Sequence, residues 1–260
     1  MKNHEHVQFE VDDLGVATIT LNRPEKFNAF NEQTVSEWYE CLMYCYQNND
    51  IKVVVLTGAG KAFCAGGDLD HMLHSAEHEN ALERKNFLWR GVHQVAKTVE
   101  MLDKPYLCAI NGTARGAGMD MTLMTDIRIM AESATMAESY INVALMPGDG
   151  GAYYLPRIVG MAKALELFWT GRVVSSAEAL SMGLVSKVVP DDELMVEVYK
   201  LAHTIASKPP APIRFTKRAA YRGVGQDLHT ALDLASSNMA VLEDLPEHKE
   251  ALLQFVERKK

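Results

Sequence analysis

The sequence predicts an α/β fold with a parallel sheet at its core and a purely helical C-terminal part. Short apolar runs typical of strands alternate with helical patterns over roughly the first 190 residues. The runs at 51–57 and 106–110 are apolar throughout, as expected for parallel strands buried on both faces. Alternating strands and helices favour a parallel sheet, because each helix carries the chain back to the start of the next strand. Four later segments have helical patterns with no strand among them: 191–206, 211–221, 227–242 and 246–258.

The composition narrows the classes of protein that this chain can belong to. With 260 residues, 48% of them apolar and 23% charged, the chain has the profile of a globular protein with one large domain, or with a domain and a small appendage. No apolar run approaches the roughly 18 residues of a membrane span, and the first six residues lack the apolar core of a secretory signal. We therefore expect a cytoplasmic protein. The net charge of −8 argues against a general nucleic-acid binder.

Neither the histidines nor the cysteines form a metal-binding pattern. His71, His74 and His78 recur at helical spacing, but no cysteine or acidic partner at ligand spacing reinforces them. They indicate an exposed polar helix, and no metal is expected. The cysteines include no pair separated by two residues, so we expect free thiols in a reducing compartment. They are Cys41, Cys45, Cys64 and Cys108.

The first elements are a hairpin, a loop and a helix. Segments 7–10 and 16–21 are strand-like and flank an acidic turn that ends in glycine. A loop at 22–30 follows, since Pro24 breaks the strand pattern. Asn31 is a good N-cap for a helix that runs to about residue 47, with apolar residues at helical spacing.

The middle of the chain supplies the central strands and the loops between them. The strand at 51–57 leads into a glycine-rich loop at 58–68, and a long polar helix at about 79–102 ends before Lys104-Pro105. The strand at 106–110 comes next. Further strands are expected at 126–130, 134–138 and 184–189, and short helices after the glycine loop at 146–151 and at 161–169 and 173–180. A proline-rich break near 208–212 divides the chain into a core domain, 1–207, and a helical region, 208–260.

The turn at 111–120 (NGTARGAGMD) links the strand at 106–110 to a buried helix. A strand, a turn of small residues and a helix let backbone N–H groups approach a ligand, and the helix dipole favours negative charge there. Asp120 lies three residues beyond Ala117, one turn along the same face. Two interpretations are open for this turn alone: glycines that only permit close packing, or half of an active site.

A second glycine-rich turn, Ala65-Gly66-Gly67, follows the strand at 51–57. Ligands of open α/β sheets bind beyond the carboxyl ends of the strands, so both turns can face one crevice. Two backbone N–H groups that converge on one oxygen form an oxyanion hole, in which each donor contributes about 2.7–4 kcal/mol of transition-state stabilisation. Neither turn matches a Walker-type or dinucleotide fingerprint.

Collinear motifs in this chain resemble those of the enoyl-CoA hydratase/isomerase (crotonase) family. They are 22–30 (NRPEKFNAF), 61–69 (KAFCAGGDL), 111–120, 147–151 (PGDGG) and 175–185 (SSAEALSMGLV). The resemblance covers most of the chain and implies a crotonase-like α/β fold of repeated β-β-α units that form a spiral core. It also implies that region 208–260 builds oligomer contacts in a homotrimer or a dimer of trimers. The implied substrate is an acyl-CoA thioester of the kind met in fatty acid metabolism, with no cofactor beyond the coenzyme A that the substrate carries.

The resemblance also assigns roles to residues. The N–H groups of Gly67 and Ala117 would hold the thioester oxygen and stabilise the enolate that forms next. A basic segment around Lys217 would meet the phosphates of coenzyme A, from its own or a neighbouring subunit, although its plainer interpretation is a solvated helix face. The other residues implied to bind coenzyme A are Lys26, Phe27, Ala29, Ala65, Gly66, Asp68 and Leu69.

The chain departs from the family pattern at the acids. Hydratases of this family use two glutamates, whose positions fall here on Asp120, which is shorter, and Tyr140, which is neutral at pH 7 and a better donor than base. Asp149, in the glycine loop, is a candidate replacement, with an Asx turn or helix N-cap as its alternative role. The direction of the neighbouring Glu138 side chain is not predicted.

The expected function is hydration of a 2-enoyl-CoA, with Asp120 as acid/base and Tyr140 and Asp149 assisting. Three alternatives keep the fold and the thioester. Double-bond isomerisation needs one group that shuttles a proton, and hydrolysis of a thioester or β-diketone needs a carboxylate nucleophile or an activated water. The third alternative is a catalytically silent acyl-CoA binder.

Overall fold

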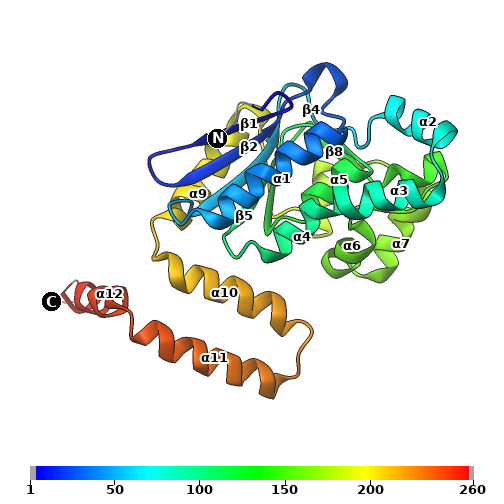
Figure 1. The fold of residues 1–260 in the computed structure, drawn as a ribbon. Helices are drawn as coiled ribbons and strands as arrows, with labels where there is room; N and C mark the ends of the chain where they lie inside the picture. The colour runs from blue at the N-terminus through cyan, green and yellow to red at the C-terminus, as the bar shows by residue number, and fades with distance from the viewer. Residues whose placement is uncertain (1–3, 258–260) are drawn as a thin grey trace.

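The computed structural model describes residues 4–257, and its centre is a six-stranded sheet (Figure 1). The strand order is β1-β2-β3-β5-β7-β10, in which β1 runs antiparallel to β2 and every other neighbour is parallel. The strands are β1 (Val7–Val11), β2 (Val16–Leu21), β3 (Val53–Gly58), β5 (Tyr106–Ile110), β7 (Ile127–Ala131) and β10 (Lys187–Val189). The predicted hairpin and parallel core are confirmed. The predicted helix end at 258 and the first three residues lie outside the described part.

A second, smaller sheet stands beyond the ends of the first. It has the order β4-β6-β8-β9 and consists of β4 (Ala62–Cys64), β6 (Thr113–Arg115), β8 (Thr135–Ala137) and β9 (Val174–Ser175). The strands β4, β6 and β8 each follow β3, β5 and β7 after a turn of a few residues, so the expected β-β repeat recurs three times. The parallel pairing of β4 with β6 places the turns that follow these two strands next to each other.

Helices cover the large sheet on both sides (Figure 1). The helix α1 packs against β1, β2 and α4, whereas α9 packs against β2, β3, β5 and β7. Asn31 caps α1 as predicted, accepting a 3.0 Å hydrogen bond from the Thr34 N–H. The helices of the main body are α1 (Glu32–Gln47), α2 (Leu69–His78), α3 (Ala81–Phe87), α4 (His93–Met101), α5 (Ala117–Leu123), α6 (Gly151–Val159), α7 (Met161–Thr170), α8 (Ser176–Ser181) and α9 (Leu194–Ala206).

Three elements differ from the sequence-based expectation. The helix expected at 173–180 begins only at Ser176, because Val174–Ser175 form β9 by pairing with β8. The polar helix expected at 79–102 is two helices, α3 and α4, joined by a π-helical turn at Leu88–Val92. Such a turn inserts one extra residue and rotates the faces of the helix that follows, which apolar periodicity alone does not reveal. The glycine-rich loop at 58–68 contains β4, because its residues pair with β6 rather than with a sequence neighbour.

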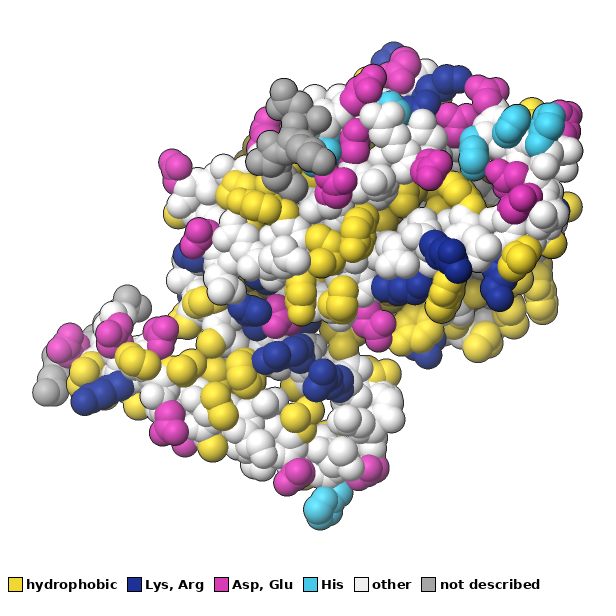
Figure 2. Space-filling view, viewed as in Figure 1, with side chains coloured by type: hydrophobic (Ala, Val, Ile, Leu, Met, Phe, Trp, Pro, Cys, Tyr) yellow, Lys and Arg dark blue, Asp and Glu magenta, His cyan; other side chains and the backbone are white. Residues whose placement is uncertain are grey.

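The C-terminal helices form an arm that leaves the body of the molecule (Figure 1). The arm consists of α10 (Pro210–Gly223), α11 (Leu228–Glu243) and α12 (Pro246–Glu257). None of these three helices contains a buried residue, and the buried apolar core of the described chain ends at Ala206 in α9. Hydrophobic side chains are nevertheless prominent on the arm (Figure 2); Val224 and Leu228, for example, are 80% and 74% exposed.

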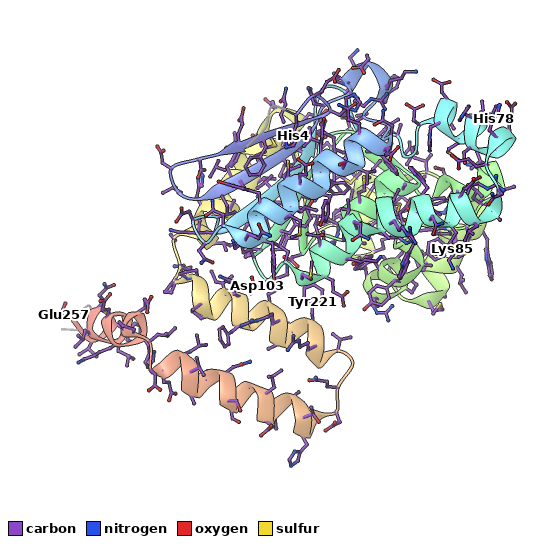
Figure 3. All side chains as sticks on the ribbon, in the orientation of Figure 1. His4, His78, Lys85, Asp103, Tyr221 and Glu257 are labelled. Atoms are coloured by element: carbon purple, nitrogen blue, oxygen red, sulfur yellow. The ribbon has the colours of Figure 1, made fainter. Side chains whose placement is uncertain are left out.

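Polar contacts attach the arm to the body. Arg214 pairs with Asp103 at 2.8 Å, while Lys217 and Tyr221 both bind the carboxylate of Asp126, at 2.8 and 2.7 Å. Figure 3 shows Asp103 and Tyr221 at this junction. Within residues 4–257, no helix combines the length and the apolar character that a membrane crossing requires.

Candidate active site

The turns that carry Gly67 and Ala117 are packed together by glycines. Parallel pairing aligns Cys64 in β4 with Ala114 in β6, so the residues that follow each strand meet. A Cβ added to Gly118 would overlap the carbonyl oxygen of Cys64, and one added to Gly66 would stand 2.8 Å from the carbonyl oxygen of Arg115. Any larger residue at these positions would force the two turns apart.

Gly67 and Ala117 each direct a backbone N–H away from regular pairing. Phe30 bonds to the flanking residues of Gly67, donating to the carbonyl of Gly66 at 2.9 Å and accepting from the N–H of Asp68 at 3.0 Å. Because N–H groups alternate in direction along an extended chain, the N–H of Gly67 points away from Phe30. Ala117 is the first residue of α5, where an N–H has no intrahelical acceptor. An oxygen held near both groups could accept two hydrogen bonds.

Asp120 lies on the third position after Ala117 in α5, a helix whose residues are all buried. Its side chain is 0% exposed. One carboxylate oxygen, Oδ2, accepts a hydrogen bond from the hydroxyl of Tyr140 at 2.8 Å and another from the backbone N–H of Asp149 at 3.1 Å. The chain thus folds a glycine loop 29 residues away onto this carboxylate.

Tyr140 and Asp149 complete a buried polar cluster with Asp120. Tyr140 stands in a 3₁₀ turn, Ser139–Val143, that follows β8, and its hydroxyl lies 3.0 Å from Oδ2 of Asp149. Behind Asp149, Nε2 of His93 donates to the carbonyl of Gly148 at 2.8 Å and lies 3.9 Å from Oδ1 of Asp149. Of the three side chains singled out as acid/base candidates, Tyr140 therefore contacts both aspartates, and Asp120 contacts Asp149 through its backbone N–H.

Burial sets the protonation of this cluster. Loss of water raises the pKa of Asp149 to about 6, helped by the nearby charge of Asp120 and opposed by the Tyr140 hydrogen bond. The pKa of Asp120 is also raised by burial, against the hydrogen bonds that it accepts. Burial and the two aspartates raise the pKa of Tyr140, so the phenol keeps its proton throughout the neutral range.

Glu138 belongs to the same cluster, although the sequence did not assign it a place. The residue follows β8, is 1% exposed, and directs its carboxyl group toward Asp120. Burial, with the charge of Asp120, raises its pKa to about 10. The signal that could have found it is a carboxylate directly after a buried strand and two residues before Tyr140.

Apart from Lys217, the residues expected to bind coenzyme A lie on or next to two adjoining loops. The N–H of Ala65 donates to the carbonyl of Phe27 at 3.0 Å, which ties residues 22–30 to residues 61–69. Phe27 and Leu69 are 60% and 64% exposed, and Lys26 pairs with the exposed Asp70 at 3.0 Å. These side chains are available to a ligand on the surface beside Gly66 and Gly67.

Asp68, Ala29 and Arg23 hold these loops in place. Asp68 caps α2 and pairs with Arg23 at 3.1 Å, and Arg23 also donates to the carbonyl of Ala29 at 2.6 Å. The carboxylate of Asp68 is therefore used within the protein, and its expected contact with coenzyme A stays a prediction. Arg23 belongs to the motif at 22–30 and had no expected role. Its contacts with Asp68 and Ala29 hold the two loops in position.

Lys217 is not brought to the other candidate residues within one chain. Its ammonium donates to the carbonyl of Lys104 and to Asp126, each at 2.8 Å, and Asp126 also accepts from the N–H of Tyr106 at the start of β5. This is the opposite end of the strand from the turn that carries Ala117. A contact of Lys217 with the phosphates of coenzyme A therefore requires a neighbouring subunit.

The histidine series lies on α2, an exposed helix as expected. The rings of His74 and His78 stack at 4.4 Å, and Figure 3 shows His78 at the outer end of the molecule. Over residues 4–257, no group of three histidine, cysteine, aspartate or glutamate side chains is arranged to hold a metal ion. All four cysteines are free and buried.

Known proteins share this fold and sequence over nearly the whole chain. The family model described as enoyl-CoA hydratase/isomerase matches residues 12–260. The short-chain-enoyl-CoA hydratase of Clostridium acetobutylicum is 35% identical over 94% of this chain and 92% of its own, and the 1,2-epoxyphenylacetyl-CoA isomerase of Escherichia coli is 32% identical over 95% and 94%. The crystal structure of an enoyl-CoA hydratase from Bacillus anthracis superimposes with a TM-score of 0.91 at 34% identity, covering 98% of this chain and 97% of the other.

Proposed function

The chain belongs to the enoyl-CoA hydratase/isomerase family, and from that premise we propose that it acts on acyl-CoA thioesters. The N–H groups of Gly67 and Ala117 bind the thioester carbonyl oxygen. Charge moves onto that oxygen when the substrate becomes an enolate, so fixed donors there stabilise the transition state more than the ground state. The adjoining turns and their outward N–H groups support this assignment.

The reaction that the site supports best is hydration of a 2-enoyl-CoA. The observation that carries it is the phenol of Tyr140 between the carboxylates of Asp120 and Asp149. Asp120 takes a proton from water while the hydroxide oxygen bonds to the β-carbon and the electron pair moves to the thioester oxygen. Asp120 then returns the proton to the α-carbon, which regenerates the carboxylate. Asp149 and Tyr140 orient the water and Asp120.

Isomerisation of the double bond is the second candidate. One buried carboxylate of raised pKa suffices to move a proton from one carbon to another, and Asp149, with a pKa of about 6, has that character. The relative named as a 1,2-epoxyphenylacetyl-CoA isomerase, at 32% identity, also favours it.

The coenzyme A portion of the substrate extends over the two loops that hold Lys26, Phe27, Ala29, Ala65, Gly66, Asp68 and Leu69. Exposure of Phe27 and Leu69 beside the Gly67 turn supports this path. Lys217 of a neighbouring subunit meets the phosphates in an oligomer. Coenzyme A enters and leaves with the substrate, and no further cofactor takes part.

We also propose that region 208–260 assembles the protein into a homotrimer or a dimer of trimers in the cytoplasm. The exposed apolar side chains of an arm that lacks any buried residue support association, since such surface is unfavourable in water.

The test is a spectrophotometric assay with short-chain 2-enoyl-CoAs. Hydration abolishes the conjugated absorbance and adds one water to the product mass, whereas isomerisation leaves the mass unchanged. Asp120→Asn and Asp149→Asn are compared, and the variant that retains activity identifies the carboxyl group that is not the acid/base. Calorimetric binding of acyl-CoA with no turnover by folded oligomer across the panel would contradict both reactions and favour a silent binder.

A further inference from the structure

Glu138 and Asp120 share an unmet hydrogen-bonding requirement. Among residues 4–257, neither carboxyl oxygen of Glu138 has a hydrogen-bond partner, and Oδ1 of Asp120 is also without one. All three atoms are buried. Buried polar atoms of folded proteins are nearly always paired, so unpaired atoms that lie together require a physical explanation.

Two of the unpaired oxygens, Oδ1 of Asp120 and Oε1 of Glu138, face one point beside Gly151. A Cβ built on Gly151 would overlap Oδ1 of Asp120 and would stand 3.0 Å from Oε1 of Glu138. Only glycine leaves this space open. The backbone of the 147–151 loop thus lets two carboxyl groups from different elements, α5 and the end of β8, approach each other.

Two ionised carboxylates cannot satisfy each other, because both only accept hydrogen bonds and their charges repel. A single proton removes the repulsion and forms one hydrogen bond: the protonated carboxyl donates to the ionised one, so Oδ1 of Asp120 and one oxygen of Glu138 each gain a partner. Glu138 is the better site for the proton, since no group within residues 4–257 donates to it, whereas Asp120 accepts from Tyr140 and from the N–H of Asp149.

We propose that Glu138 is a positioning residue that carries a proton at neutral pH and donates it in a hydrogen bond to Oδ1 of Asp120. The bond fixes the Asp120 carboxylate with Oδ2 turned to Tyr140 and Asp149. It also lowers the pKa of Asp120 relative to the value that burial alone would impose, because a donor stabilises the ionised form. The pKa of about 10 at Glu138 agrees with a retained proton.

Other titratable groups surround this pair and enter any pH dependence. Tyr140 and Asp149 contact Asp120 directly, His93 lies 3.9 Å from Asp149, and the buried thiol of Cys64 senses the charge of Asp149. Tyr140 and Cys64 keep their protons, since burial raises both pKa values. Asp149, with a pKa of about 6, therefore changes charge near neutrality and contributes to the pH dependence.

The first experiment detects the proton on Glu138 and does not require enzyme activity. Infrared difference spectra of the full-length protein are compared between wild type and Glu138→Gln at pH 7 and pH 8. We expect the carbonyl band of a buried protonated carboxylic acid in the wild type at both values, and its loss in Glu138→Gln. Asp149, with a pKa of about 6, keeps a small protonated fraction at pH 7. A wild-type spectrum without the band, or a band at full strength after the substitution, would overturn the proposal. This result does not depend on the proposed function.

The second experiment measures how Glu138 changes the pKa of Asp120, and it rests on the proposed function. The amide N–H of Glu138→Gln can replace the donated proton, whereas Glu138→Leu removes the donor at similar volume. In Glu138→Leu we expect the acid limb of the kcat/KM profile to move about one unit higher, and in Glu138→Gln to stay within a few tenths of the wild type. Equal shifts in both variants would overturn the positioning role. An infrared band with no turnover in any variant would refute the proposed function and leave the shared proton intact.

Discussion

The hydroxyl of Tyr140 lies 2.8 Å from Oδ2 of Asp120 and 3.0 Å from Oδ2 of Asp149. A phenol has one proton, so it can donate to only one of these carboxyl groups at a time. If Tyr140 donates to Asp149, Oδ2 of Asp120 keeps only the bond from the N–H of Asp149; if it donates to Asp120, Asp149 must hold a proton of its own to bond to the phenol oxygen. The three side chains therefore titrate as one unit, in which the position of each proton depends on the others.

Tyr140→Phe should lower kcat/KM about 10- to 100-fold. The hydroxyl supplies a hydrogen bond to a buried carboxylate, which is worth about 1.5–3 kcal/mol when one partner is charged. Without it the pKa of Asp149 rises further, so the acid limb of the pH profile should also move to higher pH. Steady-state assays across the pH range measure both effects. An unchanged profile would show that Tyr140 does not control the aspartates.

Asp149→Asn should lower activity and raise stability at neutral pH. The pKa of Asp149 is about 6 in the folded chain against a usual 3.8, so the native state binds the proton more tightly than the unfolded state. Stability from this group is greatest at low pH and is lost as pH rises through about 6. At pH 7.5 the variant should gain about 3 kcal/mol, or roughly 6–12 °C in Tm.

Thermal unfolding at two pH values checks the cause of that gain. Near pH 4.5 the wild-type carboxyl is protonated in the folded protein but still mostly ionised in the unfolded chain, so the difference in Tm between wild type and Asp149→Asn should fall to about one third of its value at pH 7.5. A constant difference at both pH values would assign the effect to packing rather than to charge.

Ala117→Pro should remove one proposed oxyanion donor without breaking α5. Proline is accepted at the first position of a helix, where the N–H has no intrahelical partner, and the preceding Gly116 is the least restricted residue. We expect kcat to fall about 10²- to 10³-fold. Glu32→Pro, at the first position of α1, is the matched control. Equal losses in the two variants would point to a general effect of proline instead.

Gly151→Ala should disturb the carboxyl pair directly. The new methyl group would occupy the space of Oδ1 of Asp120, so either the loop or the carboxylate must move. We expect a loss of about 1–3 kcal/mol in the free energy of unfolding, as for other overpacked sites, together with reduced activity. Gly223→Ala, where a Cβ meets nothing within 4 Å, is the control and should match the wild type in both measurements.

Removal of residues 208–260 should separate folding from assembly. The buried apolar core of the described chain ends at Ala206, so the remaining part should stay folded, with its circular dichroism and cooperative melting preserved. Light scattering should show a smaller number of chains per particle than in the full protein. An unchanged number of chains would place the oligomer contacts outside the arm.

The sequence predicted the elements of the central fold well where the residues of a single segment determine the structure of that segment. The strand β5, Tyr106–Ile110, was predicted to the residue because it is apolar throughout and bounded by a proline and a polar turn. The cap at Asn31 was likewise predictable, since its donor is only three residues away. The other elements depend on features that a single segment does not reveal, such as pairing with residues far away in the sequence. β4 is three residues long and exists through its pairing with β6, and no local residue pattern marks the extra residue that the π-helical turn Leu88–Val92 inserts.

The same distinction between local and distant signals applies to the residues of the site. The two glycine turns could be placed together from the sequence, because parallel strands bring their carboxyl ends to one edge. The direction of Glu138 could not, because it depends on how the chain turns after β8 and on the open space at Gly151. A contact between Asp149 and Asp120 spans 29 residues, and no local pattern encodes it.

The bonds between Phe30 and the residues on either side of Gly67 use main-chain atoms only. The same is true of the N–H at the start of α5. Substitutions that change the chemistry at Asp120, Tyr140 or Asp149 therefore leave this part of the framework in place, provided that the glycines remain. A protein of this design can exchange its acids and alter its reaction over evolutionary time, or in the laboratory, without having to rebuild the peptide groups that face the substrate carbonyl.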